Sequence, residues 1–309
     1  MLRDALLSVA AGDTVKRVVT RLPVTAGVVR RFVAGESVSA VLKAIRGLRA
    51  DGLSVTVDYL GEHCKDEDEA TANTSTYVDL LATCADAGFG SEVEVSIKLS
   101  AFGQALGTDG DDLALGNARR VVEAAKQAGT TVTVDMEDHT TIDSTLGILH
   151  ELRRDHPDVG AVLQSQLRRT EADCRDFNKA GSRIRLCKGA YAEPANVAFE
   201  SRREVDRAYV RCMKVLLSGH GYPMLATHDP RLVEIAGALC DRYDRRPQTM
   251  EYQMLFGVRP DEQRRLARAG STVRVYVPYG DAWYGYLMRR MAEKPANAAL
   301  FLRSLTTKK

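Results

Sequence analysis

The feature that most constrains the fold is a series of eight short β-rich runs separated by long segments with helical patterns. The runs begin after Asp51-Gly52 and cover residues 53–58, 93–99, 131–136, 161–166, 183–187, 223–228, 248–254 and 272–277. The segments between them are charged and rich in alanine and leucine, and 111–128, 141–154 and 195–218 are each long enough for a crossover helix. Eight such repeats without a low-complexity linker predict a closed (β/α)8 barrel of the TIM type, an α/β fold.

A doubly wound parallel sheet is the alternative for a chain in which strands and helices alternate. It would be expected to have fewer repeats and, for a nucleotide ligand, a Gly-x-Gly-x-x-Gly turn after the first strand. The sequence has no such turn, and its 309 residues suit a single barrel. We therefore predict additional N-terminal cap helices over residues 1–50 and a catalytic barrel over residues 51–309.

Composition excludes several classes of function. Hydrophobic residues make up 45% of the chain and charged residues 27%, which is a globular balance, and the net charge of +2 gives no reason to expect a nucleic-acid partner. No apolar run approaches the ~20 residues of a membrane span. The six cysteines lack paired metal-type spacing and are typical of reduced cytosolic thiols.

The first 31 residues carry six basic residues against two aspartates, with apolar residues at helical spacing. A transit peptide has this character, but Asp4, Asp13 and the continuation of the pattern through Leu48 favour cap helices. We predict a cytoplasmic protein. The basic residues suggest a peripheral contact with the inner face of the membrane, although a barrel cap explains them as well: Arg3, Lys16, Arg17, Arg21, Arg30 and Arg31.

Several of the predicted strands alternate polar and apolar residues, whereas parallel barrel strands are usually near-continuous apolar runs. The polar positions are Glu94, Ser96 and Lys98 in one strand, Thr131, Thr133, Asp135 and Glu137 in the next, and Arg183, Arg185 and Cys187 in a third. We expect the apolar faces to pack against the helix ring and the polar faces to line the lumen. Charges in a lumen are costly unless they are paired or met by a ligand.

The C-terminal ends of barrel strands form the active sites of such folds. The polar residues expected there are Lys98, Asp135, Gln164, Arg185, Glu251 and Gln253. Their cationic members, together with Lys188, Arg289 and Arg290, predict an anionic ligand. The alternative is an ion network satisfied inside the lumen, with Lys98 paired to Asp135 and Arg185 paired to Glu251.

Two further segments carry chemistry. On a helix Tyr286, Arg289 and Arg290 share one face, and a pair of guanidinium groups is suited to gripping a carboxylate or phosphate. The turn at Gly189-Ala190 would let backbone amides approach a phosphate or ring closely. No histidine or carboxylate cluster indicates a metal site.

The motifs taken together resemble the proline dehydrogenase family, specifically its short monofunctional bacterial form. The matching segments lie in the family's order from about residue 50 to the end: Val57-Asp-Tyr-Leu-Gly-Glu62, Ile97-Lys-Leu-Ser100, Val134-Asp-Met-Glu-Asp138, Val162-Leu-Gln164, Arg185-Leu-Cys-Lys-Gly-Ala-Tyr191, Ala226-Thr-His228, Tyr252-Gln-Met-Leu-Phe-Gly257, Val275-Tyr-Val-Pro278 and Tyr286-Leu-Met-Arg-Arg290. The fifth and the last segments are the most specific. The first 50 residues add little to the resemblance.

The resemblance implies a barrel that holds FAD without a covalent link and oxidises L-proline to Δ1-pyrroline-5-carboxylate. Hydride would pass from proline C5 to flavin N5, and the electrons would leave to a membrane quinone. The product would go to a separate pyrroline-5-carboxylate dehydrogenase, as the first step of proline catabolism to glutamate. A barrel without a Rossmann turn can hold a flavin with lumen side chains and strand-end amides, while the cofactor does the chemistry.

The resemblance also implies roles for individual residues. The substrate-binding group comprises Lys98, Arg289 and Arg290 as a carboxylate clamp and Tyr191, Leu255, Tyr276 and Tyr286 as walls around the ring. Glu62 would be a gate that pairs with Arg289. The catalytic group comprises Asp135, which holds Lys98 in place, and Arg185, which would lie near flavin N5. The remaining cofactor contacts would be Met136, Gln164, Lys188, Gly189, Ala190, Thr227 and His228.

Three other functions compete with this interpretation. A flavoenzyme barrel of the methylenetetrahydrofolate reductase type would use NADH and a folate, and the Arg289 and Arg290 pair would then be superfluous. An aldolase would need a Schiff-base lysine, but Asp135 beside Lys98 would favour the charged form of that lysine. A non-catalytic barrel that binds a small anion or a protein partner would be colourless when purified.

Overall fold

The computed structural model describes residues 25–61 and 63–293 of the chain, and residues 25, 26, 28 and 289–293 of these by their backbone alone. Eight parallel strands form a closed barrel in the order of the sequence. They are β1 (Ser54–Tyr59), β2 (Val93–Ile97), β3 (Val132–Val134), β4 (Gly160–Gln164), β5 (Arg183–Cys187), β6 (Tyr222–Ala226), β7 (Glu251–Leu255) and β8 (Val273–Tyr279). The barrel closes where β1 pairs with β8 over six residue pairs, from Ser54 with Arg274 to Tyr59 with Tyr279. The predicted barrel and all eight predicted strands are confirmed.

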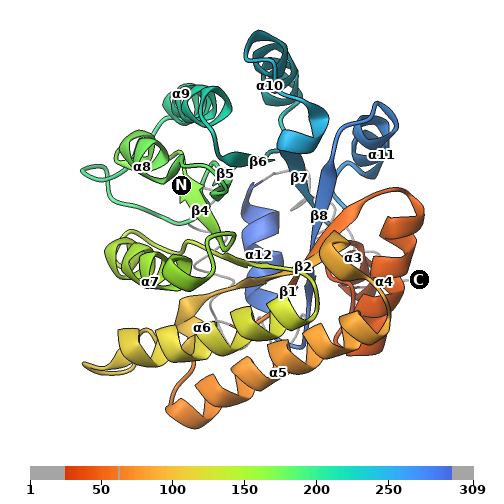
Figure 1. Ribbon diagram of the computed structural model, residues 1–309, viewed down its shortest axis with the longest axis vertical. Helices are drawn as coiled ribbons and strands as arrows, with labels where there is room; N and C mark the ends of the chain where they lie inside the picture. Colours follow the sequence, from red (N-terminus) through yellow and green to blue (C-terminus); the bar gives the residue numbers. More distant parts are fainter. Residues whose placement is uncertain (1–24, 62, 294–309) are drawn as a thin grey trace.

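Helices surround the barrel, and α12 projects onto its centre in Figure 1. They are α3 (Thr25–Phe32), α4 (Val38–Ala50), α5 (Glu67–Asp86), α6 (Gly110–Gln127), α7 (Ile142–Asp155), α8 (Thr170–Phe177), α9 (Arg202–Ser218), α10 (Pro230–Arg242), α11 (Pro260–Arg268) and α12 (Trp283–Glu293). Three short 3-10 helices are η1 (Gly90–Glu92), η2 (Leu99–Phe102) and η3 (Pro247–Thr249).

The helix predicted over 195–218 begins seven residues later than expected. Ser201 has an extended backbone, and its hydroxyl accepts a hydrogen bond from the Glu204 amide, so it is the N-cap of α9. The segment before it is a loop at the C-terminal end of β5, which places residues 188–200 beside the predicted site. Asp66 caps α5 and Asp229 caps α10 in the same manner.

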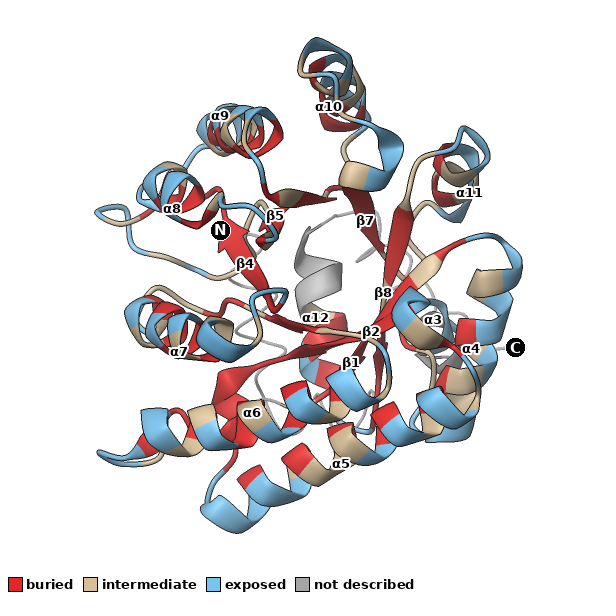
Figure 2. Cartoon of the chain, in the orientation of Figure 1, coloured by how far each residue is buried: buried red, intermediate tan, exposed pale blue. Residues whose placement is uncertain are grey.

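The core lies between the barrel and the helix ring, as the alternation of residues predicts. Figure 2 shows the strands as mostly buried, with some intermediate residues, and the helices as buried on the face toward the barrel. Val55 and Val57 of β1 and Ile184 and Leu186 of β5 belong to this apolar core. Their polar neighbours in each strand face the lumen, where they contact one another across the barrel.

A second, smaller apolar cluster holds α12 in place. Trp283, Tyr284, Tyr286 and Leu287 pack with Phe32, Val33 and Leu60. The Trp283 indole donates a hydrogen bond to Glu36 at 3.0 Å. Backbone hydrogen bonds join Ala34 to Pro278 and Gly280 to Gly35 at 2.9 Å each. The segment after α3 therefore fixes the start of α12 next to the end of β8. The division of the chain at residue 50 remains a prediction, and residues 1–24 lie outside the described part.

Candidate active site

At the C-terminal end of the barrel, Asp135 is surrounded by four other polar side chains, those of Ser96, Lys98, Arg185 and Tyr276. Asp135 follows β3, and one of its carboxylate oxygens lies 2.7 Å from Arg185 Nη1 and 2.8 Å from Ser96 Oγ. The other oxygen accepts a hydrogen bond from Tyr276 Oη at 2.8 Å and lies 3.4 Å from Lys98 Nζ. Burial alone would raise the pKa of Asp135, but the charges of Lys98 and Arg185 hold it below its ordinary value. The predicted pairing of Asp135 with Lys98 is confirmed.

Lys98 has a closer partner that the sequence interpretation did not assign. Asp58 at the end of β1 lies 2.7 Å from Lys98 Nζ, and it is 1% exposed. Burial lowers the pKa of Lys98, but Asp58 and the other nearby anionic groups outweigh burial and raise that pKa well above its usual value. A lysine held in its charged form is a poor Schiff-base nucleophile, which argues against the aldolase alternative.

Below this layer the lumen contains a second group of charges. Glu94 lies 2.7 Å from Arg183, 3.6 Å from Arg185 and 3.9 Å from Arg274. Glu251 lies 2.9 Å from Arg274. Thr56 and Thr133 donate hydrogen bonds to the Glu94 carboxylate at 2.8 and 3.2 Å.

The ion pairs of both layers connect into one network of four cations and four carboxylates: Lys98, Arg183, Arg185 and Arg274 with Asp58, Glu94, Asp135 and Glu251. The internal ion network considered as an alternative is therefore present. One of its expected pairs was wrong, because Arg185 reaches Glu251 only through Gln253, which accepts from Arg185 Nε at 2.5 Å and donates to Glu251 at 2.6 Å. The described lumen balances its own charges and does not by itself require an anionic ligand.

One atom of this network has unused hydrogen-bonding capacity. Arg185 Nη2 is buried and makes no hydrogen bond within residues 25–61 and 63–293, with Glu94 as its nearest carboxylate at 3.6 Å. The guanidinium carbon also lies 5.3 Å from the centre of the Tyr276 ring. A buried cationic donor of this kind fits a bound group that accepts a hydrogen bond or takes up negative charge at the mouth of the barrel.

The residues predicted to contact a cofactor lie at the ends of β3 to β6. Met136 is buried, and the Gln164 amide donates to the Glu137 carbonyl at 2.6 Å. His228 Nε2 accepts a hydrogen bond from the Leu255 amide at 2.8 Å. Thr227 Oγ accepts from the Asp229 amide at 3.2 Å.

The turn after β5 combines a paired lysine with a constrained glycine. Lys188 Nζ lies 2.5 Å from Asp206 of α9 and 3.3 Å from Asp229 at the start of α10. Gly189 has a φ of +102°, and a Cβ there would lie 2.3 Å from Cδ of Gln166. Only glycine fits this turn without strain, and the approach of the Gly189 and Ala190 amides to a phosphate or ring stays a prediction.

Three of the predicted residues cannot be placed. Glu62 lies outside the described residues, and Arg289 and Arg290 lie in α12 but their side chains are outside the described part. Tyr286 is buried in the cluster around α12, and Tyr191 is partly exposed in the loop after β5. The predicted clamp and gate therefore stay predictions.

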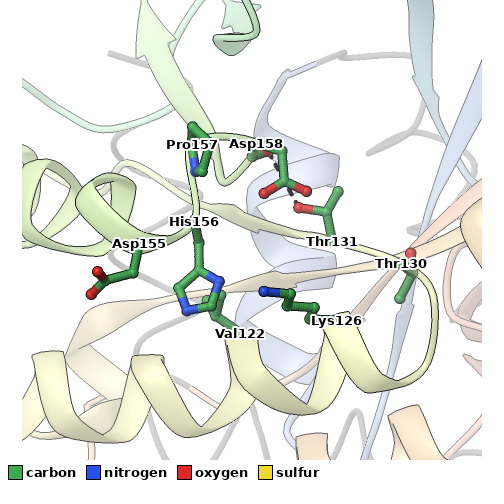
Figure 3. A pocket seen from close by; sticks show the side chains of 8 residues that line it. All are labelled: Val122, Lys126, Thr130, Thr131, Asp155, His156, Pro157 and Asp158. Atoms are coloured by element: carbon green, nitrogen blue, oxygen red, sulfur yellow. Dashed lines mark hydrogen bonds between the residues drawn. The ribbon is translucent and has the colours of Figure 1, made fainter.

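A small pocket of about 140 Å³ lies away from this site, between the C-terminal parts of α6 and α7 (Figure 3). Thr131 precedes β3 and Asp158 precedes β4, so this pocket is at the N-terminal end of the barrel, where barrel enzymes do not place their active sites. Thr131 Oγ donates to the Asp158 carbonyl at 3.2 Å in this pocket. We assign the pocket to the packing of the barrel base.

The described residues contain neither a metal-binding cluster nor a membrane-spanning helix. No group of three or more histidine, cysteine, aspartate or glutamate side chains in this part of the chain is placed to hold a metal ion. Across the same residues, no helix has the length and apolar character needed to span a bilayer.

Comparison with known proteins gives a consistent family. Residues 41–303 match the family model described as Proline dehydrogenase. The chain is 35% identical over 308 residues to Proline dehydrogenase 1 of Bacillus subtilis (strain 168), and the alignment covers 100% of both chains. It is 38% identical over 307 residues to Proline dehydrogenase of Deinococcus radiodurans, covering 98% of this chain and 97% of that protein.

Among solved structures, the chain is similar to proline utilization A (PutA) from Bdellovibrio bacteriovorus inactivated by N-propargylglycine. The TM-score is 0.79 and the sequence identity is 24%, and the match covers 86% of this chain and 32% of that chain. It is also similar to PutA from Corynebacterium freiburgense, with a TM-score of 0.75, 21% identity and coverage of 99% and 34%. The chain thus spans about a third of the length of these structures. At this identity they support the fold of the barrel.

Proposed function

The chain belongs to the proline dehydrogenase family, and from this premise we propose that it oxidises L-proline to Δ1-pyrroline-5-carboxylate with FAD as its cofactor and a membrane quinone as its electron acceptor. The observation that supports this proposal most strongly is the meeting of Lys98, Asp135, Arg185 and Tyr276 at the C-terminal end of the barrel. These groups come from four strands, β2, β3, β5 and β8, or from the residue directly after them, and the turn after β5 beside them requires glycine at position 189.

The residues present fit a flavin. Arg185 Nη2 is a buried donor with no hydrogen bond among the described residues, and it suits a ring nitrogen that gains negative charge. Gln164 and Met136 would face the ring, the turn at Lys188, Gly189 and Ala190 would meet the ring edge and the pyrophosphate, and Thr227 and His228 would hold the adenosine side. When bound, FAD would supply the acceptor for hydride from proline C5.

The substrate carboxylate would be held by cations at the mouth of the barrel. Lys98 is charged, but Asp58 and Asp135 already compensate it. Additional positive charge is therefore needed, and we propose that Arg289 and Arg290 of α12, the helix that follows β8, would supply it. Asp135 keeps Lys98 and Tyr276 in place for this contact.

Apolar groups would enclose the proline ring and exclude water. Tyr276 already lies against Arg185, and Leu255, Tyr191 and Tyr286 come from three further elements around the mouth. Glu62 would close the site by pairing with Arg289. The substrate nitrogen must be neutral for hydride to leave C5, and Lys98, as a cation, would favour binding of the carboxylate without accepting that proton.

The electron acceptor and the product define the partners. The quinone lies in a membrane, so we propose a peripheral contact at the inner membrane face that involves the basic residues near the N-terminus. The product would pass to a separate pyrroline-5-carboxylate dehydrogenase.

The test is a turnover assay with L-proline and a soluble quinone analogue that follows formation of the cyclic imine product. We expect imine formation to require both compounds and to be lost in Arg185→Met. Oxidation of NADH by the same preparation, with no imine formed from proline, would contradict the proposal and favour the reductase-type barrel.

A further inference from the structure

The partner of Lys98 has no assigned role in the proposed reaction. Asp58 is the last lumen-facing residue of β1, after Ser54 and Thr56, and its side chain is almost fully buried. Its carboxylate lies 2.7 Å from Lys98 Nζ, whereas Asp135 is 3.4 Å from the same atom. Asp58 is thus the nearest anion to the lysine that we place in the substrate clamp.

The geometry leaves Lys98 dependent on Asp58. The groups that face the ammonium are Asp58 from β1, Asp135 after β3, Tyr276 from β8 at 3.4 Å and Tyr77 from α5, whose hydroxyl lies 3.4 Å from Asp58. Asp135 is shared, because it also holds Arg185 at 2.7 Å and Tyr276 at 2.8 Å. Without Asp58, only a shared carboxylate would balance a lysine that is 9% exposed.

Burial makes this dependence strong. A buried ammonium loses its hydration, so its charge persists only where an anion is held close to it. Burial lowers the pKa of Lys98, and the carboxylate of Asp58 is the foremost influence that raises it. Burial also raises the pKa of Asp58 above its ordinary value, and the contact with Lys98 counteracts part of this rise.

We propose that Asp58 is a positioning residue that fixes the ammonium of Lys98 at the mouth of the barrel and keeps it charged for the substrate carboxylate. The proposal rests on the function proposed above, because it gives Lys98 a substrate to bind. Asp58 itself would not touch the substrate. Its effect on proline binding would pass entirely through Lys98.

The test is a double-mutant cycle of Asp58→Asn and Lys98→Met, with KM and kcat for proline measured from about pH 6 to pH 9. Relative to the wild type, we expect the KM of Asp58→Asn to rise with pH, by up to about tenfold per pH unit once the pH exceeds the lowered pKa of Lys98, because the charged form of the lysine declines at that rate. The change in kcat should be small. In the Lys98→Met background, Asp58→Asn should have no further effect on KM.

Thermal unfolding of the same four proteins gives a readout that needs no proline turnover. Lys98→Met should lower the Tm because it leaves Asp58 buried and unpaired, and adding Asp58→Asn should recover part of the loss. Asp173→Asn is the matched control, since Asp173 is a buried carboxylate in an ion pair with Arg169 at 3.0 Å on the outer helix α8. It should leave KM and its pH dependence unchanged.

Two results would overturn the proposal. One is a KM of Asp58→Asn that follows the wild-type value at every pH, and the other is an equal effect of Asp58→Asn with and without Lys98. If Asp58→Asn does not fold, Lys98→Met and the double variant still decide the point, because no recovery of Tm would show that the two residues do not act as a pair. A wild type that cannot oxidise proline would contradict the proposed function, and the Tm cycle would still test the pair.

Discussion

Replacing Glu94 by glutamine is expected to destabilise the barrel by on the order of 3 kcal/mol at neutral pH. Glu94 is 1% exposed and lies among Arg183, Arg185 and Arg274. Burial alone would raise the pKa of Glu94, but the three guanidinium groups lower it from 4.5 to about 2. Each pKa unit corresponds to about 1.4 kcal/mol, so the ionised carboxylate contributes on the order of 3 kcal/mol. Removal of one partner from a buried ion pair typically costs a similar ~3–5 kcal/mol.

The pH dependence of this contribution has a definite sign. The pKa of Glu94 is lower in the folded chain than in the unfolded chain, so its contribution is fully present above about pH 4.5 and is lost as the pH falls toward about 2. The difference between the wild type and Glu94→Gln should therefore be largest near neutral pH and shrink as the pH falls through this window.

The assay is urea unfolding of both proteins at a series of pH values from about 7 to about 2.5. Glu92→Gln is the control, because Glu92 lies two residues away and pairs with Arg49 at the surface, with its side chain 55% exposed. We expect the control to lose less than about 1 kcal/mol. A loss below about 1 kcal/mol for Glu94→Gln at neutral pH, or a loss that stays constant down to the lowest pH, would refute the reasoning.

Three further substitutions test the proposed site. Arg290→Ala, or Arg289→Ala, should raise the proline KM about tenfold to a hundredfold, because each removes a charge-assisted contact worth roughly 1.5–3 kcal/mol. The flavin content should stay the same, and the control Arg268→Ala, at an exposed position, should change neither KM nor flavin content. An unchanged KM would remove the two arginines from the clamp. Gly189→Ala should lower both the Tm and the flavin-to-protein ratio. A residue with a side chain is destabilised by roughly 1–2 kcal/mol in this left-handed backbone conformation, and the new Cβ would collide with Gln166. Wild-type values of both quantities would show that the turn tolerates a side chain.

The fold followed from the sequence because its two periodicities are local properties. Short β-rich runs and the long helical segments between them can be counted without any knowledge of tertiary contacts. Alternation within a strand also identifies the lumen face, so Glu94, Ser96, Lys98, Asp135 and Arg185 could be placed together before the structure was known. The start of α9 was missed because Ser201 as an N-cap resembles any other serine in a charged segment.

The ion partners could not be obtained in the same way. Which lumen residues touch depends on strand register and tilt, and these are set by all eight strands at once. Arg185 and Glu251 both face the lumen, yet Gln253 lies between them and Glu251 pairs with Arg274. Asp58 carried a usable signal, since it is the only charged residue in β1 and lies on the same face as Thr56. Its place in a family motif does not indicate a partner, so its pairing with Lys98 was not predicted.

The central claim is that this barrel binds a flavin that proline reduces. The most direct measurement is the visible absorbance spectrum of the purified protein under anaerobic conditions, before and after addition of L-proline. We predict flavin bands that bleach with proline and persist with NADH. A protein that stays colourless after FAD is added, or one with flavin bands that only NADH bleaches, would contradict the claim.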